Sequence, residues 1–476
     1  MLSTTSSRSS LWRFSLVAKS FLTESGLPFS SVLSEERIAQ AFAEEGCEVP
    51  EQDPDEEMIY TPAVTLWAFL SQMLFADEQR SCLAAVARVA VLWAALGKEI
   101  CASNSGAYCR ARAKLSEAAI HRLACNVADE CERQAPEDWL WCGRHVYIGD
   151  GTTLSLPDTR ENQARYPQPQ SQKPGLGFPL VRLVVLFSLA TGLLRDAALG
   201  PYSGKETGEP ALLRELFSRF QPGDVFLADR CYAGWFLIVL LQELGVDVVS
   251  RLHQLRDADF QRGQQLGQGD HVTEWPRPPR PEWMDEETYA RMPSHLRIRE
   301  VQVQVSERGF RVRSFVIVTT ILDADKYPRD ELAKLYRWRW LVELNLRALK
   351  STLHLDVLRC KTPDMVHKEL RAALLGYNLI RRNMFQAALE AERSPRDLSF
   401  TVAMQTIAAA WLVAAIVEEL VPLLIQLRQV HLASHRVGNR PNRIEPRAIK
   451  RRPKPHDLLT IPRDEARAKL LAAPGS

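Results

Sequence analysis

The sequence lacks the signals that mark several large classes of protein. Its 476 residues contain no Cys-x-x-Cys pair and no Cys/His cluster at zinc spacing, which argues against a zinc-stabilised fold. Residues 1–20 are rich in Ser and Arg and have no apolar stretch of signal-peptide length. The net charge is only +2, so the chain is not basic throughout. No internal repeat is visible, which argues against a repeat architecture.

The cysteines form no recognisable framework for disulfide bonds. There are nine of them, an odd number, and they are scattered, so we expect reduced thiols and a cytoplasmic location. Long hydrophobic runs are also scarce. The one candidate membrane span, residues 398–417, contains Ser, Thr and Gln, is rich in Ala and runs directly into two Glu residues. We therefore expect a buried or interface helix there and no membrane contact.

What is present fits a globular protein with an uneven distribution of charge. A hydrophobic content of 46% and a charged content of 25% are ordinary for a folded protein of two to four structural units. Residues 44–57 are strongly acidic, whereas residues 436–454 carry eight Arg or Lys against one Glu. The basic segment is rich in Pro and Asn. It is suited to lie along phosphates, although many such tails serve only solubility.

Apolar runs in the middle of the chain predict an α/β domain. Three strands come first, and helices then alternate with two further strands, an order typical of a mixed sheet with packed helices. The expected strands are 145–156, 180–189, 194–199, 225–228 and 246–252, and the expected helices are 208–220 and 235–244. A Pro-rich piece and a probable hairpin, with strands 298–305 and 312–319 turning at Glu307-Arg308-Gly309, then interrupt this order.

This pattern divides the chain into five regions. We expect a helical N-terminal region, a catalytic domain in two parts separated by a β-rich insertion, and a helical C-terminal region with a basic tail. Their bounds are 1–135, 144–254 and 319–385 for the two catalytic parts, 255–318 for the insertion, and 386–476. In the first region, Arg110, Arg112 and Lys114 make a small basic cluster, which fits either DNA contact or a solvated helix face.

The segment 336–350 has the most informative pattern. Read as part of one helix from about 328 to 354, it places Tyr336, Arg339, Glu343 and Lys350 within about 60° of one another. A carboxylate holds Mg²⁺, and the other three side chains hold phosphates. A solvated face with a weak ion pair is the alternative. An adjoining stripe should be buried: Leu335, Trp338, Val342, Leu346, Leu349 and Leu353. Trp340 lies off that stripe, where it could stack on a base.

Two aspartates follow apolar strand residues and are candidate partners for Glu343. Asp150 lies within the first expected strand, and Asp229 ends the fourth. Ligands of α/β sheets bind at the carboxyl ends of strands, although such an Asp can instead cap the next turn. Together with Glu343, these residues make a three-carboxylate metal site plausible. Two Mg²⁺ ions at such a site could activate a water or a 3′-hydroxyl for in-line displacement.

These residues resemble the DDE triad of RNase H-like transposases. The spacing Tyr-x2-Arg-x3-Glu-x6-Lys is met in full and is similar to the signature of bacterial insertion-sequence transposases of the insertion-sequence-four type. The segments that follow Asp150, surround Asp229 and span 439–453 also resemble this family, as does a β-rich insertion before the glutamate. The resemblance covers about 60 to 467 and implies an RNase H-like mixed sheet with packed helices, plus helical terminal regions.

The resemblance also implies an activity, cofactors and partners. Asp150, Asp229 and Glu343 would bind two Mg²⁺ or Mn²⁺ ions. They would cut double-stranded DNA at terminal inverted repeats, in this branch through a hairpin, and join the 3′-ends to target DNA. Tyr336, Arg339 and Lys350 would contact phosphates, and Arg230, Tyr232 and Trp340 are weaker candidates for DNA contact. Two protomers would hold the two ends. The alternatives are an RNase H-like nuclease without strand transfer and an inactive, transposase-derived DNA-binding protein.

Overall fold

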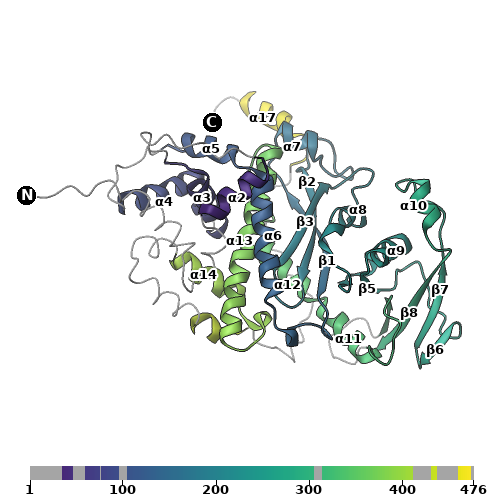
Figure 1. The fold of residues 1–476 in the computed structure, drawn as a ribbon. Coiled ribbons are helices and arrows are strands. Elements are labelled where there is room, and N and C mark those ends of the chain that lie inside the picture. The colour runs from purple at the N-terminus through teal and green to yellow at the C-terminus, as the bar shows by residue number, and fades with distance from the viewer. Residues whose placement is uncertain are drawn as a thin grey trace, which may run out of the picture.

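The structure, a computed structural model, describes residues 35–46, 59–75, 77–95, 104–304, 314–410, 430–436 and 459–472. Within these ranges the chain builds one nine-stranded mixed sheet in the order β3-β2-β1-β4-β5-β9-β8-β7-β6 (Figure 1). The strands are β1 Val146–Ser155, β2 Leu180–Ser188, β3 Leu194–Pro201, β4 Val225–Leu227, β5 Asp247–Arg251, β6 Gln264–Gly267, β7 Asp270–Pro276, β8 His295–Gln304 and β9 Ser314–Thr319.

The first five strands form an RNase H-like sheet, as the sequence predicts. β1 pairs antiparallel with β2, which pairs antiparallel with β3, while β4 and β5 run parallel to β1 on its other side. β2 is a nearly continuous apolar run because both of its faces are covered by helices, and β1 is apolar and buried over its first three residues. The predicted α/β fold class is therefore confirmed.

The stretch between β5 and the glutamate helix extends the same sheet. β9 pairs antiparallel with β5, and β8, β7 and β6 follow outward as a meander. The sequence did not indicate β6, β7 or the short helix α10 (Glu286–Arg291). β6 is a four-residue edge strand with mostly exposed side chains, so it lacks the apolar alternation that identifies a strand. The turn expected at 307–309 lies outside the described residues.

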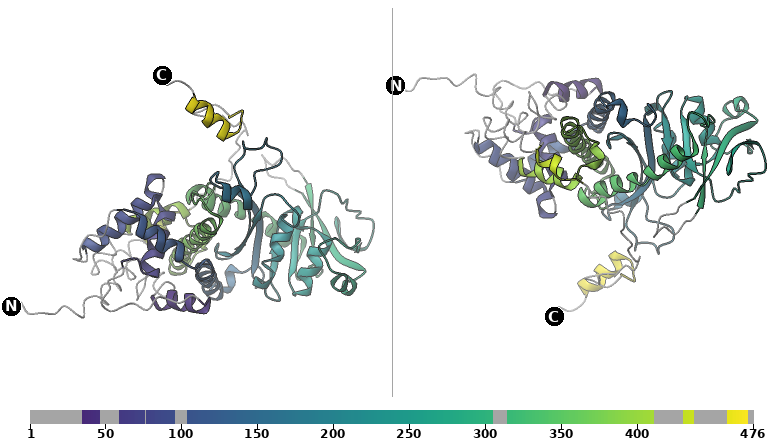
Figure 2. Two further views of the ribbon diagram at one scale, coloured as in Figure 1. Left: turned by 90° about the horizontal axis from the view of Figure 1, so that it is seen from above. Right: turned by 90° about the horizontal axis from the view of Figure 1, so that it is seen from below.

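Strand alternation divides the interior into two cores, one on each face of the sheet. Ile148 and Leu227 face one core, which is covered by α6 (Glu117–Arg133) and α13 (Pro363–Glu390). Phe226 and Val248 face the other, which is covered by α8 and α9. The bounds of these last two helices are Glu209–Arg214 and Trp235–Glu243. The ribbon views show both layers (Figures 1 and 2).

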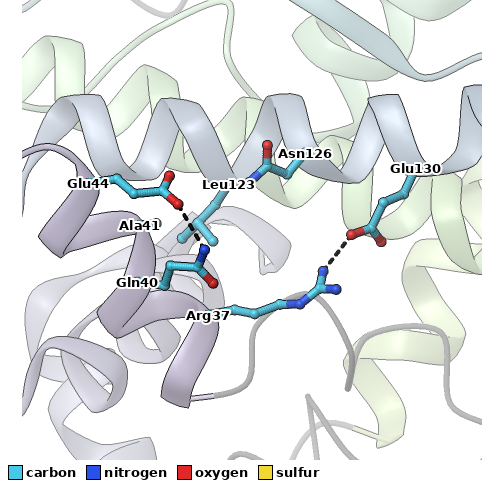
Figure 3. Close-up of a pocket in the computed structure, with 7 residues that line it drawn as sticks. All are labelled: Arg37, Gln40, Ala41, Glu44, Leu123, Asn126 and Glu130. Atoms are coloured by element: carbon cyan, nitrogen blue, oxygen red, sulfur yellow. Dashed lines mark hydrogen bonds and ion pairs between the residues drawn. The ribbon is translucent and has the colours of Figure 1, made fainter.

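The N-terminal helices pack around α6 and α13. They are α2 Glu35–Glu44, α3 Pro62–Leu74, α4 Cys82–Ala95 and α5 Gly106–Lys114. Between α2 and α6 lies a polar cavity of about 210 Å³, which Arg37 and Glu130 bridge with an ion pair (Figure 3). None of the predicted site residues lines it. In α5, Arg110 and Lys114 are exposed, whereas Arg112 packs inward over Phe69 and bonds Gln72.

The C-terminal elements are only partly described. α14 (Phe400–Ala410) packs on α13 with Ala403 and Ile407 buried, so the described half of the 398–417 stretch is a helix with a buried face. No helix in the described ranges is both long and apolar enough to cross a membrane. The basic segment 437–454 lies outside those ranges, as do residues 47–57 of the acidic stretch. α17 (Arg463–Ala472) projects from the body (Figure 2). Its first residue, Arg463, pairs with Asp158.

The helix expected from 328 to 354 is broken into three pieces, which corrects the prediction. α11 (Arg329–Trp338) is followed by a tighter turn, then by α12 (Leu341–Arg347) and a π-helical turn, η5 (Ala348–Thr352). In the tight turn, the amide of Trp340 bonds the carbonyl of Arg337, three residues back, at 3.2 Å. A single 3.6-residue period therefore does not apply. Most of the stripe is buried, but Trp338 is 36% exposed, so its predicted core position is wrong.

Asn345 connects α12 to the rest of the protein through two buried arginines. Its side-chain oxygen accepts hydrogen bonds from Arg381 of α13 and from Arg396, each at 2.9 Å. Arg396 also bonds the backbone carbonyls of Ser188 and Leu189. Burial lowers the pKa of Arg396 to about 9. One buried amide oxygen thus joins the glutamate helix, α13 and the end of β2.

Asn345→Ala should destabilise the protein by about 3 kcal/mol or more, because both guanidinium groups lose a buried acceptor. Asn345→Asp should recover most of that loss, since a carboxylate accepts both bonds and replaces an amide nitrogen that is buried without a partner. Urea unfolding of both variants measures this. The exposed control Asn126→Ala should stay within about 0.5 kcal/mol of wild type. A loss below about 1 kcal/mol for Asn345→Ala would contradict the assignment.

Candidate active site

The pairing of β1 with β4 brings the two predicted aspartates together. In this parallel pair, Ile148 lies opposite Leu227. Asp150 and Asp229 each lie two residues further on, at the carboxyl end of the pairing. Because side chains alternate along a strand, both are in register with the face that packs against α11 to α13. Adjacent strands are about 4.8 Å apart, so two carboxylates emerge side by side at this edge.

Asp150 lies in a half-buried, electrostatically mixed environment. Burial raises its pKa to about 6, and the negative charges of Asp229 and Glu209 add to that rise. The amide of Gly151, 2.8 Å from its Oδ1, and the guanidinium of Arg339 act in the opposite direction. A carboxyl that gains a proton this easily is one that a cation would relieve.

Asp229 combines a structural role with its place in the carboxylate group. Its Oδ1 accepts the amide of Cys231 at 2.8 Å and so caps η4, the 3-10 turn Arg230–Tyr232. Its backbone carbonyl accepts the hydroxyl of Ser250 at 2.6 Å. The capping that was the alternative reading of this Asp is therefore present, and it holds the side chain at the strand end.

Glu343 lies on α12, the helix that packs against β1. Its side chain is 43% exposed, and its Oε1 lies 3.5 Å from a guanidinium nitrogen of Arg339. Arg339 also acts on the pKa of Asp150, so one cation is shared between carboxylates from the helix and from the sheet. Arg339 occupies the tight turn between α11 and α12, which explains how it reaches both.

The other predicted contacts are distributed unevenly. Tyr336 packs against Phe315 and is mostly buried, which raises its pKa. Lys350 donates to the hydroxyl of Thr152 and to the carbonyl of Thr153, both at 3.1 Å. Lys350 therefore ties the π-helical turn to β1 just beyond Asp150.

The three weaker candidates for DNA contact differ in how far their side chains are exposed to solvent. Arg230 is exposed, and Trp340, which directly precedes α12, is 57% exposed. Tyr232 is fully buried, so packing explains it. Sequence reasoning missed Glu209, the first residue of α8. Its Oε2 accepts the hydroxyl of Tyr232 at 3.3 Å. An acidic residue at the start of a helix is too ordinary to draw attention.

The donor set is chemically suited to a hard divalent cation, because every candidate ligand is a carboxylate oxygen. Among the described residues, the only three metal-type side chains with ligand atoms within 4.8 Å of one another are His121, Cys125 and Asp196. Asp150, Asp229 and Glu343 are therefore less tightly gathered than that. The His121 group is a poor cation site, since Arg219 and Arg371 already lie within 4.0 Å of Asp196.

An RNase H-like sheet with aspartates side by side on two adjacent parallel strands, and a glutamate on a packed helix, defines a protein with an acidic centre on its sheet. The family is then plain: the chain belongs to the transposase DDE domain family, whose sequence model matches residues 141–379.

Several known proteins are similar to this chain. Transposase InsG for insertion sequence element IS4 of Escherichia coli K12 is 29% identical over 300 residues, which cover 61% of this chain and 64% of that relative. The chain thus matches less than two thirds of that relative's length. Putative transposase InsL for insertion sequence element IS186A, also from K12, is 43% identical over 82 residues, or 17% of this chain and 21% of the relative.

One solved structure is also similar, at a low level. It is the cryo-EM structure of the piggyBac transposase synaptic complex with hairpin DNA, with 10% identity and a TM-score of 0.42. The alignment covers 90% of this chain and 87% of that one.

The raised pKa of Asp150 predicts a pH-dependent effect of Asp150→Asn on the metal-free protein. The stability that the protonated carboxyl contributes is fully present below about pH 4 and is lost as the pH rises through about 6, a total of about 3 kcal/mol. In chelating buffer, the variant should therefore gain Tm over wild type at pH 8. The gain should shrink at pH 5 by the equivalent of roughly 1.5 kcal/mol.

The exposed control Asp257→Asn should change Tm little at either pH. An equal gain for Asp150→Asn at pH 5 and pH 8 would show that the ionised Asp150 carboxylate is not destabilising.

Proposed function

We propose that this protein is a cut-and-paste DNA transposase that cleaves the ends of its own element and joins the 3′-ends to target DNA. The observation that carries the proposal is the parallel register of β1 and β4, which sets Asp150 beside Asp229 opposite the helix of Glu343. Membership of the transposase DDE domain family supports the same reading. An acidic edge alone would also suit an RNase H-like nuclease, which makes the products of the reaction the deciding measurement.

Asp150, Asp229 and Glu343 would together hold Mg²⁺ or Mn²⁺, two ions per site. Such ions activate a water or a 3′-hydroxyl and stabilise the leaving oxygen during in-line displacement. Arg339, now paired with Glu343, would turn to a DNA phosphate once the carboxylates are neutralised. Lys350 bonds Thr152, two residues beyond Asp150 on β1, and would add a second phosphate contact. Tyr336, Arg230 and Trp340 would complete the contact surface.

The partners follow from the chemistry of cutting two ends. Double-stranded DNA with terminal inverted repeats would be bound by the N-terminal helices and the basic C-terminal tail, largely through salt-dependent phosphate contacts. The exposed pair Arg110 and Lys114 on α5 offers one such contact. Two protomers would hold the two ends in one complex in the bacterial cytoplasm, and a hairpin at the element end would be the intermediate. The exposed ring of Trp340 is suited to stack on a base moved out of the duplex.

The proposal predicts cleavage of linear DNA that carries the flanks of the gene. With Mg²⁺ or Mn²⁺, wild type should cut at a pair of inverted repeats and produce hairpin ends, detected on denaturing gels. Glu343→Gln should reduce cutting by about a hundredfold or more, the scale of losing one group that stabilises a transition state. The matched control Glu331→Gln, on the preceding helix, should cut like wild type.

Binding without cutting by wild type would instead identify an inactive DNA-binding relative. Cutting without any joining of 3′-ends would identify a nuclease.

A further inference from the structure

Glu209 brings a fourth carboxylate to the acidic centre, and it comes from the opposite face of the sheet. It begins α8, which packs on β1, β2, β3 and η4. Asp150 and Asp229 are in register with the α12 face, whereas α8 covers the other face. Glu209 therefore approaches β1 and β4 from the α8 face of the sheet, opposite to the face of Asp150 and Asp229.

Its first contact is with β1, at the residue after Asp150. A Cβ atom added to Gly151 would lie 2.2 Å from the carboxyl carbon of Glu209 and 2.3 Å from its Oε1. Any side chain at position 151 would therefore displace the carboxylate. Gly151 leaves this space open, and the Glu209 carboxylate fills it directly against the backbone of the strand that carries Asp150.

Its second contact is with η4, the turn that Asp229 caps. The Oε2 of Glu209 accepts the Tyr232 hydroxyl at 3.3 Å and the Cys231 thiol at 3.4 Å. Tyr232 is fully buried, and within the described part of the chain its hydroxyl donates to Glu209. One carboxylate thus joins the two segments that position Asp150 and Asp229.

We propose that Glu209 is a positioning residue for divalent-cation binding at Asp150 and Asp229, acting through its negative charge from the α8 face. The inference rests on the proposed function, since it takes those two aspartates to hold the cation. A third anion behind the pair makes the electrostatic potential at their carboxylates more negative and thereby strengthens the attraction for a hard cation such as Mg²⁺ or Mn²⁺.

The test is calorimetric titration of Mn²⁺ into the full-length protein without DNA, a readout independent of cleavage. Glu209→Gln removes the charge but keeps an acceptor oxygen for Tyr232. It should bind Mn²⁺ about tenfold more weakly than wild type with little change in Tm. Asp150→Asn should lose binding. The matched control Glu215→Gln, an exposed residue at the other end of α8, should equal wild type.

Two further variants separate charge from hydrogen bonding. Glu209→Asp keeps the charge but shortens the reach to Tyr232, so it should hold Mn²⁺ better than Glu209→Gln. Tyr232→Phe removes the hydroxyl and should stay near wild type. The reverse order of the two Glu209 variants would overturn the proposal, because it would assign the effect to the hydrogen bond.

The outcomes also separate this inference from the proposed function. Wild-type affinity in Glu209→Gln, with binding lost in Asp150→Asn, would overturn the role of Glu209 and leave the metal centre standing. No Mn²⁺ binding by wild type would overturn both. Should Glu209→Gln fail to fold, Glu209→Asp and Tyr232→Phe still decide: a tenfold loss in Tyr232→Phe at normal Tm contradicts a role through charge.

Discussion

The parallel pairing of β1 with β4 is the constraint on which the rest of the site depends. Ile148 opposite Leu227 puts Asp150 and Asp229 at the same level, two residues beyond the pairing. A slip of one residue would turn Asp150 to the α8 face and leave Asp229 alone. Glycines hold the pattern on the other face. A Cβ at Gly149 would lie 2.4 Å from the ring of Phe226, so only glycine lets the second core close there.

Carboxylates gathered in this way carry an electrostatic cost of the kind that proteins tolerate at functional sites. Burial and the neighbouring acids raise the pKa of Asp150 to about 6, and the Gly151 amide and Arg339 only partly offset them. The arrangement is more typical of a cation-binding site than of a set of structural ion pairs. A cation that binds such carboxylates only in the folded state would stabilise the folded protein.

The helix α12 carries Glu343 on its exposed side and is held in place by contacts on its buried side. The buried oxygen of Asn345, held by Arg381 and Arg396, provides such contacts from a position two residues away. Arg339 lies at the break between α11 and α12, so its direction is not set by a single straight helix. The π-helical turn then brings Lys350 down onto β1.

The sequence by itself determined the strands β1 to β5, β8 and β9 and the residues with the chemistry. The apolar runs of β1 to β5 and the spacing from Tyr336 to Lys350 are local patterns, and each reports on its own backbone. Tertiary structure alone decided where the helix breaks, that β9 joins β5, and that Trp338 is exposed. It also decided that Glu209 faces Gly151. These features arise from contacts between segments far apart in the chain, which periodicity along a single segment does not encode.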